Sequence, residues 1–306
     1  MALENCRILV TGANGFIGKN LVFRFREMLG ITVVPFVRGD NESSLADLVS
    51  GCDAIVHLAG ENRPTDDAKF FAVNAGLTEA LCEAINQEYC KNGRHVPIVM
   101  ASSTQVAQNN AYGRSKLAGE SAIQKLAADT SNPSYIFRLP GVFGKWCRPN
   151  YNSVVATFCY NIARDLPIQI IDPAKSLSLV YIDDVIDAII ATLEANNIGL
   201  MHVKVEKEHL ISLNDLACQI RAFKNCRTTL VSERVGNGLV RALYSTYLSY
   251  LPSDSFSYEV PQHADSRGIF VEMLKTEDSG QFSYFTANAG VTRGGHYHNS
   301  KTEKFL

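Results

Sequence analysis

The feature that most constrains the fold is a glycine-rich turn near the start of the chain. Residues 7–10 (RILV) form a short apolar run typical of a buried strand, residues 11–18 (TGANGFIG) contain three glycines, and residues 19–29 (KNLVFRFREML) have a helical pattern. In such a strand–turn–helix unit, the glycines permit a tight turn, close approach of backbone to a pyrophosphate, and close packing of helix on sheet. The helix dipole then favours the phosphates. The turn therefore predicts dinucleotide binding; the alternative is a glycine turn without a ligand.

The segments after this turn alternate between strand-like and helix-like patterns. Strands are expected at residues 31–37, 53–60, 97–103 and 134–144, and helices at 43–51, 70–89, 115–129, 154–165 and 182–196. Strands that alternate with helices indicate βαβ units and a parallel sheet covered on both faces. We therefore predict an α/β fold with a Rossmann-like, doubly wound parallel sheet.

The pattern of residue types changes after the Pro-Ser-Asp-Ser turn at residues 252–255. From about residue 256 the pattern alternates and is rich in β-formers, as in GIFVEML (268–274), FSYFTANAGV (282–291) and GGHYH (294–298). A turn-rich stretch at a change of pattern marks a domain boundary. We expect an α/β domain at residues 1–252 and a second, β-rich domain at residues 253–306.

The end of the second strand bears on the choice of dinucleotide. The sequence there is Val37-Arg38-Gly39-Asp40. An acid at the strand tip would bind a ribose 2′-hydroxyl, whereas an arginine suits a 2′-phosphate. Because Arg38 is at the tip and Asp40 lies beyond a glycine, we favour NADPH as the cofactor. The alternative for Arg38 is a solvated surface charge.

A serine, a tyrosine and a lysine predict the catalytic centre. Tyr112 and Lys116 are four residues apart at the start of a predicted helix, and Ser103 ends the preceding strand. A nearby ammonium lowers the pKa of a phenol, which is otherwise a poor acid–base catalyst at neutral pH. The chain has a second YxxxK, at Tyr297 and Lys301, but it lies across a predicted strand and turn. The alternative is that Tyr112 only packs its ring and Lys116 is solvated.

Basic and amide residues downstream are candidates for the substrate site. Arg138 lies in a predicted strand, and a loop containing Lys145, Arg148 and Asn152 surrounds the single tryptophan, Trp146. Loops at the carboxyl ends of parallel strands bind ligands in this class of sheet. We expect Lys145 and Arg148 to bind a diphosphate and Asn152 to bind a sugar or phosphate oxygen, with Arg138 a further candidate for the substrate site.

Two histidines and a glutamate near the C-terminus predict a metal site. On a strand, His296 and His298 point to one face, and Glu303 would return from the next strand. Such a set suits zinc or another divalent cation. The set is incomplete, with a fourth ligand expected beyond residue 306; the alternative is two surface histidines on a hairpin.

Composition limits the partners and the compartment. The formal net charge is −2, with 46% hydrophobic and 20% charged residues, and the basic residues are scattered. Neither nucleic acid nor a membrane surface is therefore an expected partner. The eight cysteines form no CxxC pair, and there is no leader or membrane-length apolar run, so we expect a cytoplasmic protein with reduced thiols.

These motifs resemble the extended short-chain dehydrogenase/reductases, most of which act on nucleotide sugars. The likeness rests on the TGxxGxxG turn, the serine before YxxxK, and Asn74 on an intervening helix, and it covers about residues 5–250. It implies a catalytic triad of Ser103, Tyr112 and Lys116. One departure is Gln105-Val106-Ala107-Gln108 after the serine, where many members have Val-Tyr-Gly. The residues assigned to the cofactor site are Gly12, Asn14, Gly15, Phe16, Ile17, Gly18, Arg38, Leu58, Ala59, Gly60, Asn74 and Lys116.

The C-terminal part resembles cupin-fold epimerases of nucleotide-linked 4-keto-6-deoxy sugars, through residues 265–272 (DSRGIFVE) and 290–296 (GVTRGGH). The pairing of both parts resembles the CapF-type bifunctional enzymes of capsular polysaccharide synthesis. That resemblance implies that a complete cupin epimerises C3 of a UDP-2-acetamido-2,6-dideoxy-4-hexulose. The reductase domain then reduces C4 with NADPH to give UDP-2-acetamido-2,6-dideoxy-L-talose. The cupin is expected to be incomplete here, with zinc possible in the complete domain and a homodimer expected for the full-length protein.

Three other readings of the sequence stay open. The same fold supports a nucleotide-sugar 4-epimerase or dehydratase, which would hold NAD tightly and consume none. A non-catalytic dinucleotide-binding protein would bind the cofactor without oxidising it. A scaffold would use the C-terminal segment as a dimerisation element.

Overall fold

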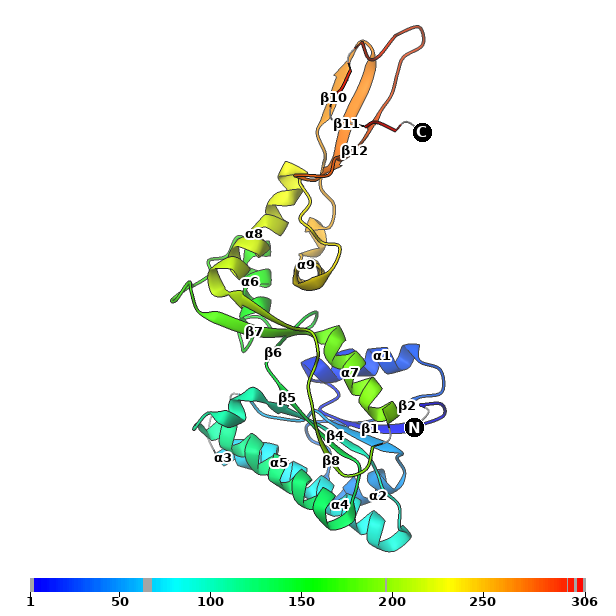
Figure 1. Ribbon diagram of the computed structural model, residues 1–306, viewed down its shortest axis with the longest axis vertical. Helices are drawn as coiled ribbons and strands as arrows, with labels where there is room; N and C mark the ends of the chain where they lie inside the picture. Colours follow the sequence, from blue (N-terminus) through cyan, green and yellow to red (C-terminus); the bar gives the residue numbers. More distant parts are fainter. Residues whose placement is uncertain (1–2, 63–67, 196, 296, 300–301, 305–306) are drawn as a thin grey trace.

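The computed structural model describes residues 3–62, 68–195, 197–295, 297–299 and 302–304 (Figure 1). Its largest element is a six-stranded sheet in the order β2-β1-β3-β4-β5-β8, with every neighbouring pair parallel. The strands are β1 (Arg7–Thr11), β2 (Thr32–Phe36), β3 (Ala54–His57), β4 (Ile98–Ser103), β5 (Ser134–Leu139) and β8 (Leu200–Val203). The predicted doubly wound parallel sheet is confirmed.

Helices cover both faces of this sheet (Figure 1). One face carries α1 (Phe16–Glu27) and α7 (Ile182–Ala195), and the other carries α2 (Leu45–Ser50), α4 (Leu77–Asn92) and α5 (Ala111–Thr130). Because successive side chains of a strand point to opposite faces, β1 sends Ile8 and Val10 into the first layer and Leu9 into the second. Fully apolar strands are what a sheet buried on both faces requires.

The strand order fixes where a ligand is expected to bind. The chain leaves β1 for β2 on one side and then returns to β3 on the other, so β1 and β3 are neighbours. In doubly wound sheets this reversal opens a crevice at the carboxyl ends of the two strands. The turns after β1 and β3 meet at that edge. Four short elements follow the strands β2, β3 and β4: η1 (Glu42–Ser44), α3 (Ala68–Phe71), the π-helical turn η2 (Ala72–Gly76) and the 3₁₀ turn η3 (Thr104–Ala107).

A smaller layered unit lies beside the parallel sheet. It contains the strands β6 (Gly141–Phe143), β7 (Ser176–Tyr181) and β9 (Glu208–Ser212) and the helices α6 (Val154–Ala163), α8 (Leu213–Thr229) and α9 (Gly238–Leu248). Phe143, Phe223 and Tyr247 are buried in its core. Residues 134–144, predicted as one strand, are two strands in two sheets. Pro140 separates them, because its nitrogen has no hydrogen to donate to a strand ladder.

A third, antiparallel sheet forms the far end of the molecule (Figure 1). It contains β10 (Gln262–Asp265), β11 (Gly268–Lys275) and β12 (Gln281–Phe285), preceded by the short turn η4 (Ser253–Ser255). The strand predicted at residues 294–298 is not present among the described residues there. Gly294 and Gly295 have φ angles of +113° and +86°, which interrupt an extended backbone. The boundary at residues 252 and 253 stays a prediction.

Two expectations from composition concern thiols and membrane spans. All eight cysteines are free, and Cys6, Cys52, Cys82 and Cys159 are buried. Within the described residues, no helix combines the length and apolarity needed to cross a bilayer.

Candidate active site

The glycine turn after β1 is folded so tightly that side chains do not fit it. Gly12 has a φ of +68°, and a Cβ placed there would lie 2.7 Å from the Ala59 nitrogen. A Cβ at Gly18 would lie 2.2 Å from the Gly12 oxygen, and the Gly15 nitrogen donates to that oxygen at 2.8 Å. The turn therefore presents bare backbone in front of α1, as a pyrophosphate-binding site requires. Asn14, Phe16 and Ile17 lie in the turn and the first helical residues.

Arg38 and Asp40, which follow β2, have different partners. The Arg38 side chain is 86% exposed, and one of its nitrogens is 2.6 Å from a carboxylate oxygen of Glu61. The Asp40 carboxylate accepts a hydrogen bond from the Val37 nitrogen at 2.7 Å. Asp40 thus stabilises its own turn, while the Arg38 guanidinium keeps further donors that face solvent.

Buried hydrogen bonds fix the turn after β3. Thr11 Oγ1 is 2.7 Å from His57 Nδ1, and Thr78 Oγ1 is 2.8 Å from His57 Nε2. Burial, assisted by the charge of Lys116, lowers the pKa of His57 to about 3, so the ring is neutral. The Ala59 nitrogen donates to Thr11 Oγ1 at 3.2 Å. The network holds Leu58, Ala59 and Gly60 against the glycine turn.

The Asn74 side chain forms its hydrogen bonds with other residues of the protein. Its side chain is buried, accepts from the Glu61 nitrogen at 2.8 Å and donates to the Glu61 oxygen and to Ser115 Oγ at 3.1 and 3.0 Å. A Cβ at Gly60 would lie 3.1 Å from Asn74 Oδ1 and 3.0 Å from Lys116 Nζ. Asn74 therefore positions the backbone beside the predicted cofactor site.

Ser103 lies close enough to Tyr112, at the carboxyl edge of the sheet, to act on the pKa of the phenol. Ser103 ends β4, and its Oγ also accepts from the Gln105 nitrogen at 3.1 Å. Tyr112 lies in the first turn of α5, which Asn110 caps by accepting from the Gly113 nitrogen. Burial raises the pKa of Tyr112, and the nearby Ser103 hydroxyl partly offsets this.

Lys116 lies one helical turn beyond Tyr112 and is buried. Its Nζ donates to the Ala101 oxygen at 3.0 Å. Burial lowers the pKa of Lys116 to about 8, against the opposing effect of the Glu120 carboxylate. The sequence-based expectation was that Lys116 lowers the pKa of Tyr112. In the structure the ammonium is bound to a backbone carbonyl, and desolvation of the phenol dominates.

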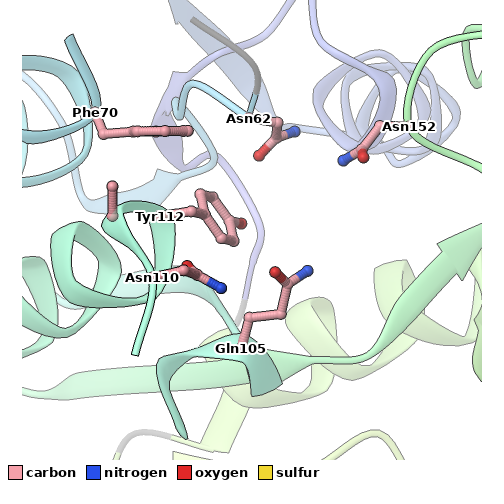
Figure 2. Close-up of a pocket in the computed structure, with 7 residues that line it drawn as sticks. Asn62, Phe70, Gln105, Asn110, Tyr112 and Asn152 are labelled. Carbon is pink, nitrogen blue, oxygen red and sulfur yellow. The ribbon is translucent and has the colours of Figure 1, made fainter. Parts of the chain in front are cut away.

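A cavity of about 360 Å³ opens in front of Tyr112 (Figure 2). Its lining residues come from four separate parts of the chain: Asn62, Phe70, Gln105, Asn110, Ala111, Tyr112 and Asn152. The Phe70 ring lies edge-on to Tyr112, with the ring centroids 5.8 Å apart. Of the predicted substrate residues, Asn152 lines this cavity. Sequence reasoning did not identify the roles of Asn62, Phe70, Gln105 and Asn110; the only signal was the unusual Gln105 after the serine.

The three basic residues predicted to bind substrate have partners elsewhere. Arg138 forms a paired contact with the buried Glu120 carboxylate, its Nη2 lying 2.6 Å from Oε2. Lys145 Nζ lies 5.3 Å from the Trp146 ring centroid, and the Arg148 guanidinium lies 5.1 Å from that of Tyr151. None of the three lines the cavity, so their assignment to the substrate site stays a prediction.

The predicted metal residues are described only in part. His298 Nε2 is 3.0 Å from a Glu303 oxygen, whereas His296 lies outside the described residues. No group of three ligand-type side chains able to hold a metal occurs within the described ranges. The three-ligand set stays a prediction.

The fold and this site define a dinucleotide-dependent enzyme class, and comparison with known proteins agrees. The chain belongs to the NAD-dependent epimerase/dehydratase family, whose model matches residues 8–203. A model described as a polysaccharide biosynthesis C-terminal domain matches residues 263–306. Membership of the family implies a nicotinamide cofactor, and the glycine turn described above fits one.

Individual relatives narrow the class. The chain is 55% identical to UDP-2-acetamido-2,6-beta-L-arabino-hexul-4-ose reductase of Pseudomonas aeruginosa, over 98% of this chain and 80% of that protein. It is similar to the crystal structure of the capsular polysaccharide assembling protein CapF from Staphylococcus aureus. The TM-score is 0.83 at 37% identity, over 96% of this chain and 79% of that one. The predicted resemblance to CapF-type enzymes is thereby confirmed.

A more distant structure shares the fold alone. UDP-glucuronic acid 4-epimerase from Bacillus cereus, in complex with NAD, has a TM-score of 0.67 at 20% identity, over 80% of this chain and 98% of that one. It supports the assignment of the parallel sheet and its flanking helices.

Proposed function

We propose that the chain is an NADPH-dependent reductase of the C4 ketone of a UDP-2-acetamido-2,6-dideoxy-4-hexulose. The observation that carries this proposal is Tyr112 at the wall of the 360 Å³ cavity, with Ser103 close beside it and the buried Lys116 one turn along the same helix. The 55% identity to a reductase of such a sugar supports the choice of substrate.

Each side chain of the pair has a distinct role in the proposed reaction. A reduced nicotinamide bound at the glycine turn supplies the hydride. Ser103 donates a hydrogen bond to the ketone oxygen and so orients the carbonyl. Tyr112 transfers its proton to that oxygen, and Lys116 stabilises the resulting phenolate and binds the cofactor ribose. The raised pKa of Tyr112 keeps the phenol protonated before the reaction.

Removal of the Tyr112 hydroxyl tests this proposal. With NADPH and the UDP-ketosugar, we expect Tyr112→Phe to lower kcat by at least about 100-fold, measured by absorbance of the reduced nicotinamide. The matched control is Tyr297→Phe, because Tyr297 belongs to the other YxxxK and is 84% exposed. Equal turnover by Tyr112→Phe and the unchanged chain would refute the role. Bound NAD with no net oxidation of NADPH would instead favour a 4-epimerase or dehydratase.

The preference for NADPH over NADH is assigned to Arg38. Its exposed guanidinium is available to a 2′-phosphate, while Asp40 is held by the Val37 nitrogen. We expect Arg38→Ala to raise KM for NADPH about 5- to 10-fold and to leave KM for NADH nearly unchanged. Equal changes with the two cofactors would show that Arg38 does not contact the phosphate.

The roles of the C-terminal part belong to the same proposal. A complete cupin would epimerise C3 and use His296, His298 and Glu303 with a further ligand to bind zinc, and the full-length protein would be a homodimer. His298 and Glu303 are already close, at 3.0 Å. Metal analysis of the chain and of His298→Ala, after dialysis against zinc, tests the ligand assignment. Equal zinc contents in the two would contradict it.

A further inference from the structure

Three carboxamides point into the cavity without a hydrogen-bond partner among the described residues. They are the side chains of Asn62 after β3, Gln105 in η3 and Asn152 before α6 (Figure 2). The fourth, Asn110, is already used, since it accepts from the Gly113 nitrogen at 2.7 Å and donates to Gln108 at 3.1 Å. A carboxamide that a ligand will cover must find partners on that ligand, because a buried unpaired polar group is costly. The cavity is therefore built for a ligand with several donors and acceptors.

Asn152 lies across the cavity from Tyr112, and Gln105 lies beside Tyr112 with its amide directed into the same cavity (Figure 2). The backbone of Gln105 is fixed relative to the reacting groups: its nitrogen donates to Ser103 Oγ at 3.1 Å, and a Cβ at Gly113 would lie 2.4 Å from its oxygen. Asn152 precedes Ser153, which caps α6. Both amides are thus attached to ordered backbone and line the cavity that Tyr112 also lines.

The geometry of an amide substituent suits this pair. A secondary amide is planar and trans, so its N–H and its C=O point in opposite directions. One carboxamide can reach only one of the two groups, whereas two separate carboxamides can pair with both. A hydroxyl in the same place is too short to engage both. C2 and C4 of a pyranose are separated by C3, so a C2 substituent reaches a different wall from the one that binds the ketone.

We propose that Gln105 and Asn152 recognise the acetamido group at C2 of the sugar, one donating to its carbonyl and the other accepting from its N–H. Asn62 is left to bind a ring hydroxyl. The assignment rests on the proposed function, and it makes Gln105 and Asn152 the residues that select a 2-acetamido sugar over its 2-hydroxy counterpart. Removal of a polar partner for a substrate group costs discrimination of roughly 10- to 100-fold.

The test compares two sugars with the full chain and with three variants. The sugars are the UDP-linked 2-acetamido-2,6-dideoxy-4-hexulose and the UDP-linked 6-deoxy-4-hexulose that carries a hydroxyl at C2. We expect Gln105→Leu and Asn152→Leu each to lower kcat/KM for the acetamido sugar roughly 10- to 100-fold and for the hydroxyl sugar less than about 3-fold. Gln124→Leu is the matched control, because Gln124 is exposed on the far part of α5. Gln105 and Asn152 are themselves exposed in the open cavity, so neither replacement removes a core contact.

A binding measurement keeps the assignment testable without turnover. Titration calorimetry compares UDP-N-acetylglucosamine with UDP-glucose, and we expect the preference for the former to fall in both variants and not in the control. An equal loss for both sugars, or an unchanged preference, would overturn the assignment. Absence of NADPH oxidation by the unchanged chain, with the binding preference intact, would instead refute the proposed reaction and leave the assignment standing.

Discussion

Side chains around the parallel sheet are buried and hydrogen-bonded, whereas those of the C-terminal sheet are largely exposed. Around the glycine turn, Asn74, His57 and Lys116 are almost fully buried and each has a defined hydrogen-bond partner. In the β10–β12 sheet, Phe282, Tyr284 and Phe285 are 60%, 45% and 44% exposed. Beyond Leu251, Val271 is the one buried hydrophobic side chain among the residues that the structure describes. Burial fixes the predicted catalytic groups, whereas the aromatic side chains of the C-terminal sheet are largely exposed to solvent.

Replacement of one glycine in each region is expected to give the largest difference in the free energy of unfolding. Gly18→Ala places a Cβ 2.2 Å from the Gly12 oxygen, so the backbone must shift, at a cost of about 3 kcal/mol in the free energy of unfolding, with loss of cofactor binding. Gly290 has a φ of +82° but open space around it, so Gly290→Ala is expected to cost only about 1 kcal/mol. Urea unfolding and dinucleotide titration measure both. Equal costs would remove the contrast.

A buried and an exposed carboxylate are expected to differ in their contribution to the free energy of unfolding. Glu120 is fully buried, and its carboxylate binds Arg138 and, at 2.5 Å, Ser102 Oγ. Glu120→Gln removes the charge that the guanidinium needs, so we expect a loss of about 2 kcal/mol in the free energy of unfolding. The exposed Asp265 pairs with Arg267 at 2.6 Å, and Asp265→Asn is expected to leave the unfolding midpoint unchanged. A larger loss from the exposed pair than from the buried one would contradict the account.

The pH dependence of the reduction tests whether burial controls the charge of Lys116. Burial lowers the pKa of Lys116 to about 8, so its proton is present below that pH and lost above it. Because Lys116 must be charged to stabilise the Tyr112 phenolate, kcat/KM should fall towards tenfold per pH unit above about 8. Tyr112 does not cause this loss, since burial raises its pKa above the ordinary value. A profile that stays flat to pH 9.5 would show that Lys116 is not desolvated as described.

Local patterns predicted those features that depend on residues close together in the chain. The glycine turn and its following helix occupy one short stretch, and Tyr112 and Lys116 are joined by one helical turn, so their geometry follows from the backbone. The break at Pro140 was also visible in the sequence but was included in one long strand. The strand predicted at residues 294–298 is wrong because two adjacent glycines with positive φ angles interrupt the extended backbone.

The cavity could not be predicted in the same way. Asn62, Gln105 and Asn152 come together only through the crossings of the sheet, and an isolated carboxamide carries no sequence signal. The charge of Arg138 makes it a candidate for substrate binding, but the buried acid that binds it, Glu120, is in another element. Charge in a sequence indicates what a side chain can bind, and only the fold decides its partner.

The origin of the hydrogen at C4 of the product tests the central claim most directly. The chain is incubated with the UDP-2-acetamido-2,6-dideoxy-4-hexulose and NADPH deuterated at both C4 positions of the nicotinamide, and the product is analysed by mass spectrometry and NMR. The account predicts one deuterium per sugar, located at C4, with one NADPH oxidised for each sugar reduced. Consumption of the ketosugar with no deuterium at C4, or with NADPH unchanged, would contradict it.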